Sequence, residues 1–137
     1  MPKGEALSEQ ANIWFQKAKK DLAWSRYALG GGFFSQTCFG CQQAAEKALK
    51  AYLFWRKQEL IRTHSLPQLL AKCMEFDEGF GVLGDACSVL TVYYIDTRYP
   101  GLGPSFGEDV AKEAIELASE VLELVGRKME RGADATH

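Results

Sequence analysis

Residues 33–58 read FFSQTCFGCQQAAEKALKAYLFWRKQ, and this stretch decides the fold class. Placed at 100° intervals around a helix axis, its apolar and small residues gather on one broad face. That face holds Phe34, Cys38, Cys41, Ala45, Ala48, Leu49 and Tyr52. The pattern predicts a helix over residues 33–58 with one side buried in a core.

The opposite face of this helix is polar, but two phenylalanines flank its polar residues. It holds Gln36, Phe39, Gln43, Glu46, Lys47, Lys50 and Phe54. A face that meets only water does not need aromatic side chains, so we expect a second contact surface here. For Lys47 a solvated position is the alternative. Glu46 and Lys50 have the i, i+4 spacing of an ion pair worth about 0.2–0.5 kcal/mol.

The rest of the chain also predicts helices. Ala and Leu together number 31, whereas the β-branched residues Val, Ile and Thr number 15. We expect helices over about 8–29, 66–76 and 83–94, and a last one that starts at a capping box over 105–108. Three glycines, 30–32, predict a tight turn between the first two helices. The fold class is therefore all-α, an antiparallel up-and-down bundle of four long helices plus one short helix.

We expect one domain over residues 1–137, with a core at about 8–128 and a disordered tail from about 132. The chain has 16 basic and 18 acidic residues, which excludes an overtly basic nucleic-acid binder. The charges are nevertheless divided, because residues 1–62 carry 10 basic and 5 acidic residues and residues 63–137 carry 6 and 13. No apolar run could cross a bilayer and the amino terminus has no secretory signal, so we expect a cytoplasmic protein that does not bind membranes.

The four cysteines predict no chemistry. Cys38 and Cys41 form a C-x-x-C, but there is no second pair, and both lie within a helical pattern. Buried free thiols are expected, with a site that joins them to His64 and a later cysteine as the alternative. Because motifs for nucleophilic and metal catalysis are absent, we expect no catalytic residues, no metal site and no cofactor.

His64 and Arg98 are the residues best suited to bind an anion. His64 falls at the expected start of the third helix, where free N–H groups favour a phosphate or a partner's carboxylate. Alternatively, it only fixes the entry of that helix. Arg98 lies among Tyr94, Asp96 and Tyr99, so a guanidinium for phosphate stands beside rings that could stack on a base. Equally, Asp96 could pair with Arg98 and pin the loop.

Several of these residues belong to a recognisable pattern. In order, the chain has W-x-x-x-A-x-x-D-L at 14–22, C-F-x-x-Q-Q-A-A-E-K-A-L-K-A at 38–51, T-H-x-L at 63–66 and R-Y-P at 98–100. In order and spacing this resembles the HEPN (higher eukaryotes and prokaryotes nucleotide-binding) domain over about residues 8–128. The resemblance implies a helical homodimer and a minimal nucleotidyltransferase partner, often in a toxin–antitoxin or defence module.

Many HEPN proteins are metal-independent ribonucleases with an R-x4-6-H motif, and this chain departs from that motif. Seven residues separate Arg56 from His64, one residue separates Arg62 from it, and the next histidine after Arg98 is His137. The leading hypothesis is therefore a non-catalytic HEPN homodimer that binds a nucleotide, a nucleotidyltransferase partner or both, with RNA not expected as a ligand. A metal-independent ribonuclease with a non-standard Arg/His pair and a purely structural dimer are the alternatives. The candidate ligand-binding residues are Gln43, Lys47, Lys50, His64, Tyr94, Asp96, Arg98 and Tyr99.

Overall fold

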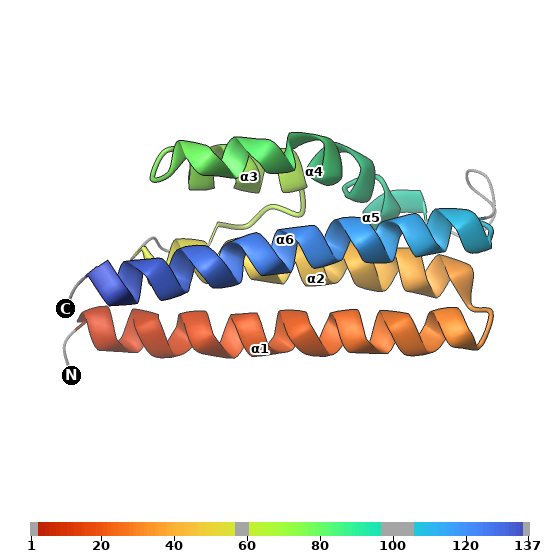
Figure 1. The fold of residues 1–137 in the computed structure, drawn as a ribbon, viewed down its shortest axis with the longest axis horizontal. Coiled ribbons are helices and arrows are strands. Elements are labelled where there is room, and N and C mark those ends of the chain that lie inside the picture. Colours follow the sequence, from red (N-terminus) through yellow and green to blue (C-terminus); the bar gives the residue numbers. More distant parts are fainter. Residues whose placement is uncertain (1–2, 57–60, 97–105, 136–137) are drawn as a thin grey trace.

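The computed structural model describes residues 3–56, 61–96 and 106–135, and every regular element in these ranges is a helix (Figure 1). The elements are α1 (Lys3–Gly30), α2 (Phe34–Trp55), α3 (Leu66–Met74), the 3₁₀ helix η1 (Glu78–Leu83), α4 (Gly84–Leu90), α5 (Tyr93–Asp96) and α6 (Glu108–Ala135). The predicted all-α bundle is confirmed.

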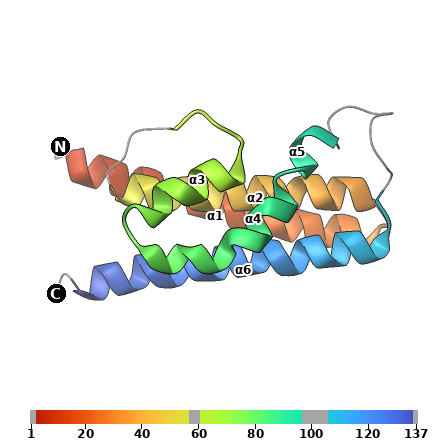
Figure 2. The same ribbon diagram turned by 90° about the horizontal axis from the view of Figure 1, so that it is seen from above.

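Three long helices lie side by side along the whole molecule (Figure 1). α1 runs antiparallel to α2 and α6, so that α1 begins and α6 ends at the same end of the bundle. The short helices α3 and α4 lie on the side of α2 and α6 that faces away from α1 (Figure 1). From above they are seen in front of these helices (Figure 2), and α3 packs on α2 while α4 packs on both α2 and α6. α2 is therefore enclosed by neighbours on most of its circumference.

The middle of the chain is more divided than its periodicity indicated. The helix expected over 66–76 ends at Met74, and the one expected over 83–94 is split into α4 and α5 by a turn at Thr91 and Val92. The Thr91 hydroxyl oxygen accepts a hydrogen bond from the Leu66 N–H at 3.1 Å. This bond ties the turn to the start of α3, so a tertiary contact accompanies the break in a continuous helical pattern.

The turn between α1 and α2 forms where the three glycines predicted it. Gly32 has φ +83°, a left-handed conformation that glycine adopts without strain. The two helices then approach closely, and α2 buries both apolar and charged residues along most of its length. From Gln36 to Lys47, the side chains of α2 that retain exposure form one stripe: Gln36, Phe39, Gln43 and Lys47.

The charge division of the sequence is visible on α6. Its acidic side chains up to residue 123 all point to solvent: Glu108, Asp109, Glu113, Glu116, Glu120 and Glu123. Six of the 13 acidic residues of the carboxy-terminal half therefore lie on the outer face of one helix. Among the described residues, none of the helices combines the length and the hydropathy that a bilayer crossing demands.

Candidate functional site

His64 is held by a buried carboxylate. It lies in the segment that enters α3, and its Nδ1 is 3.0 Å from Glu46 Oε1 and 3.1 Å from Oε2. Its ring also stacks on Tyr94 of α5, with 4.3 Å between centroids and 14° between planes. The His64 side chain is nevertheless 54% exposed. Two neighbours therefore fix the ring while one edge stays open to a ligand.

Glu46 is the centre of a hydrogen-bonded network that is almost closed to water. Its side chain is 7% exposed, Lys50 Nζ donates to Oε2 at 2.9 Å, and Gln42 Nε2 donates to Oε1 at 3.1 Å. Burial alone would raise the pKa of Glu46, but the hydrogen bonds from Lys50, Gln42 and His64 outweigh it and lower this pKa. The carboxylate is therefore ionised at neutral pH.

The ionised carboxylate sets the tautomer of His64. A carboxylate can only accept hydrogen bonds, so Nδ1 carries the proton that it donates to Glu46. In the neutral ring Nε2 is then an acceptor, on the far side of the ring from Glu46. A second bond, from Gln42 Nε2 to the His64 carbonyl oxygen at 3.3 Å, holds the backbone of the same residue.

A cavity of about 320 Å³ opens beside His64. It is lined by Trp14, Lys50, Arg62, Thr63 and His64. Lys50 Nζ lies 5.6 Å from the centroid of the Trp14 ring, so this cation has an aromatic face beside it as well as Glu46. The cavity thus joins two permanent cations, one oriented imidazole and one indole.

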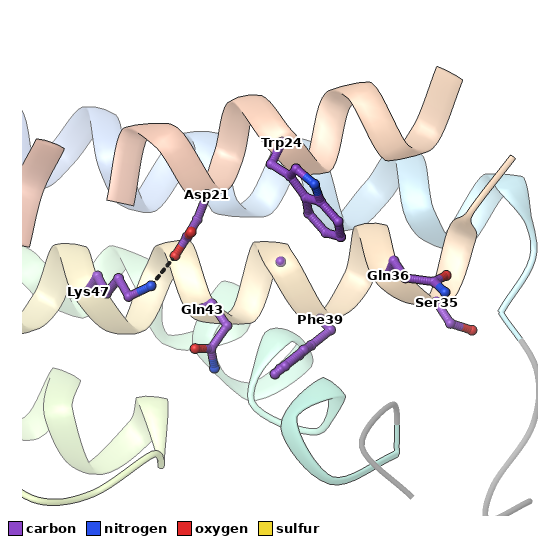
Figure 3. Close-up of a pocket in the computed structure, with 8 residues that line it drawn as sticks. Asp21, Trp24, Ser35, Gln36, Phe39, Gln43 and Lys47 are labelled. Carbon is purple, nitrogen blue, oxygen red and sulfur yellow. Dashed lines mark hydrogen bonds and ion pairs between the residues drawn. The ribbon is translucent and has the colours of Figure 1, made fainter. Parts of the chain in front are cut away.

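A second hollow, of about 380 Å³, lies further along the seam between α1 and α2. Figure 3 shows Trp24 of α1 on one side and Phe39 of α2 on the other, with Gln36 and Gln43 towards its two ends. Lys47 lies at one end and pairs with Asp21 of α1 at 2.5 Å (Figure 3). We call this the Trp24–Phe39 hollow.

The structure divides the sequence-predicted residues into two groups. Lys50 and His64 bond Glu46 and Tyr94 stacks on His64, whereas Gln43 and Lys47 line the Trp24–Phe39 hollow. One bond links the groups, from Gln43 Nε2 to Gln42 Oε1 at 2.6 Å. The side chain of Asp96, and all of Arg98 and Tyr99, lie outside the described residues.

Sequence reasoning missed Gln42, Trp14 and Arg62 as parts of a site, and it treated Glu46 only as half of a weak i, i+4 ion pair with Lys50. In fact Glu46 and Lys50 are both buried. The signal that could have found the network is the spacing of Gln42, Glu46 and Lys50, each four residues apart and therefore aligned along one helix face.

The four cysteines are free and buried, as expected. Cys38 and Cys41 face the core with the leucines and alanines of α1 and α2. Among the described residues, no group of three or more His, Cys, Asp or Glu side chains is placed to hold a metal ion.

Comparisons with known proteins agree with this architecture. The HEPN domain model matches residues 11–129. The crystal structure of TT1696 from Thermus thermophilus is similar at 36% identity, with a TM-score of 0.81, over 87% of this chain and 98% of that one. ST0689, an archaeal HEPN homologue, is similar at 30% identity, with a TM-score of 0.73, over 87% and 97% of the two chains. A search of curated protein sequences finds no significant match. Because the family model spans nearly the whole helical bundle, the chain belongs to the HEPN domain family.

Proposed function

We propose that this protein is a non-catalytic, nucleotide-binding HEPN protein whose phosphate site is the cavity beside His64. The observation that carries the proposal is the convergence of Lys50, Arg62 and His64 on one open cavity. Glu46 offsets the positive charge of Lys50, and the guanidinium of Arg62 leaves the cavity positive even when His64 is neutral. An anion is therefore favoured there, and Arg62 offers the planar fork that grips phosphate oxygens in pairs.

Calorimetry with ATP and other nucleotides tests this site. Arg62→Ala removes a charge-assisted hydrogen bond, worth about 1.5–3 kcal/mol, and should weaken binding about ten- to a hundredfold. His64→Ala should also weaken binding, because an imidazole that carries both protons donates to Glu46 from Nδ1 and to phosphate from Nε2. Arg127→Ala is the matched control, because Arg127 is exposed on α6 and does not line the cavity. The absence of heat with every nucleotide, or equal affinity in all variants, would contradict the proposal.

We also propose a homodimer with a minimal nucleotidyltransferase as partner, in a toxin–antitoxin or defence module. Membership of the HEPN family supports this assignment. Sedimentation at several protein concentrations tests the dimer, and a species that stays monomeric throughout would count against it. An adjacent nucleotidyltransferase gene would support the partner, and a pull-down with its purified product would test direct binding.

One observation favours a second function, that of a metal-independent ribonuclease. Glu46 binds His64 through Nδ1, which leaves Nε2 away from the carboxylate, and Lys50 and Arg62 line the same cavity. This arrangement suits a general base that takes a proton from a ribose hydroxyl while cations stabilise the phosphate. Cleavage of structured or single-stranded RNA in EDTA, abolished by His64→Ala, would establish it. Intact RNA in the same assay would exclude it.

A further inference from the structure

The Trp24–Phe39 hollow has no role in the proposed phosphate site, and its lining is unlike that of a simple surface dent. Trp24 is 54% exposed and Phe39 is half-buried, so two flat apolar rings border an open space of about 380 Å³. Exposed rings in water cost free energy unless something covers them. The hollow therefore has the apolar surface that a planar ligand would bury.

Gly40 keeps the wall between the two rings free of side chains. A Cβ added at this position would overlap Ser25 Oγ and lie 3.3 Å from Trp24 Cε3. Position 40 thus has room only for glycine, and its lack of a side chain lets α1 and α2 approach each other. The space between Trp24 and Phe39 stays unfilled (Figure 3).

Polar groups surround this apolar space. Gln36 and Gln43 each contribute an amide, and the Asp21–Lys47 pair lies at one end. An amide offers a donor and an acceptor side by side, which is the pattern that matches the edge of a nucleobase. Aromatic faces with amides at the rim are typical of sites that stack a base and hydrogen-bond its edge.

The hollow is also placed at a useful distance from the His64 cavity. Tyr94 stacks on His64 and makes an edge contact with Phe39, with 6.4 Å between the Tyr94 and Phe39 ring centroids. One aromatic residue therefore contacts a lining residue of each site. Gln43 and Lys50 lie on the same side of α2, seven residues or about 10 Å apart along its axis. One extended nucleotide could occupy both sites.

We propose that the Trp24–Phe39 hollow is a nucleobase subsite. It rests on the proposed function, because the phosphates of the same ligand would lie in the His64 cavity. The base stacks between Trp24 and Phe39, Gln36 and Gln43 bond its edge, and the phosphates extend along α2 past Lys47 to Lys50 and Arg62.

Separate halves of the ligand test the two sites independently. The probes are the four ribonucleosides, inorganic triphosphate and the four ribonucleoside triphosphates, each titrated by calorimetry. Trp24→Ala and Phe39→Ala should each weaken binding of at least one nucleoside, and of its triphosphate, by about fivefold or more, and should leave inorganic triphosphate unchanged. Tyr27→Ala is the matched control, since Tyr27 is 84% exposed on the same helix as Trp24 and does not line the hollow.

Each outcome separates the subsite from the phosphate site. Binding of inorganic triphosphate without any nucleoside binding, or nucleoside binding that Trp24→Ala and Phe39→Ala leave unchanged, would overturn the subsite alone. Nucleoside binding that both variants weaken, without any binding of inorganic triphosphate, would support the subsite and contradict the phosphate site. Failure of every probe would overturn both. Far-UV circular dichroism and the Tm of each variant confirm that it folds.

Discussion

At the scale of single residues, Glu46 organises the site. It is the buried carboxylate that orients His64, neutralises Lys50 and accepts from Gln42. A buried charge pair contributes little by itself, but the loss of one partner leaves the other uncompensated in a poorly solvated place. Glu46 is thus both a structural residue and the one that determines which nitrogen of His64 faces the cavity.

Glu46→Gln should destabilise the fold by about 3 kcal/mol at pH 7, because Lys50 would stay buried without its counter-charge. The folded-state pKa of Glu46 lies below its ordinary value of 4.5, so its stabilisation is present above that pH and is lost as the pH falls through the folded-state pKa. Urea unfolding at several pH values measures both effects. The loss of folding stability caused by Glu46→Gln should become smaller as the pH falls. Glu116→Gln, exposed on α6, is the control and should change stability by less than about 0.5 kcal/mol.

How much of the site could be predicted also depends on individual residues. Residue type and a family pattern select His64, Lys50 and Tyr94 as candidates. In the structure His64 and Lys50 both bond Glu46, and Tyr94 stacks on His64. The burial of Glu46 was not predictable, because periodicity shows which residues share a face of α2 but not what covers that face. Likewise, Lys47 pairs with Asp21, which is 26 residues away, and local spacing does not reveal such a contact.

At the scale of elements, the contact between α1 and α2 shapes the hollows. Gly40 lies against Ser25 with no room for a Cβ between them, and Trp24 and Phe39, their neighbours in the sequence, line the hollow. The three long helices were predictable because each has a sustained apolar stripe. The division of 83–94 was not, because the break at Thr91 is accompanied by a bond to Leu66, which lies 25 residues away.

Gly40→Ala should destabilise the protein by about 1–2 kcal/mol. Alanine gains about 1 kcal/mol of helix propensity over glycine. The added Cβ would overlap Ser25 Oγ and lie 3.3 Å from Trp24 Cε3, so the buried Ser25 side chain must rotate or the two helices must move apart. Adding Ser25→Ala removes the clashing oxygen and should recover part of the loss, so urea unfolding of both single variants and the double variant forms a thermodynamic cycle. Gly84→Ala is the control: nothing lies within 4 Å of its added Cβ, and stability should hold or rise. An unchanged or more stable Gly40→Ala would show that the helices are not in tight contact there.

At the scale of the whole molecule, charge is distributed between the two halves of the chain. Residues 1–62 have a net charge of +5 and contribute Lys47, Lys50 and Arg62, whereas the acidic side chains of α6 face solvent. The small overall charge of −2 therefore conceals a molecule with a basic region around the site and an acidic helix elsewhere. The composition predicted this division, but only the fold shows that residues 1–62 supply the whole lining of the Trp24–Phe39 hollow and the lysine and arginine of the His64 cavity.

Raising NaCl from about 50 mM to about 500 mM should weaken triphosphate binding by several-fold and leave nucleoside binding nearly unchanged, because salt screens exposed charges and not ring stacking. Calorimetry at the two salt concentrations measures the difference. Equal salt sensitivity for both ligands would indicate that phosphate does not bind among the cations of the basic half.

The four buried cysteines give this protein a built-in reporter of its own opening. Burial raises the pKa of Cys38 to about 11 and of Cys87 to about 12, and only a thiolate reacts with alkylating reagents. In the native state the thiols are therefore protected, and labelling must wait for the helices that cover them to separate. The rate of thiol labelling, followed by mass spectrometry without any introduced probe, measures how often the core opens and whether a bound nucleotide slows that opening.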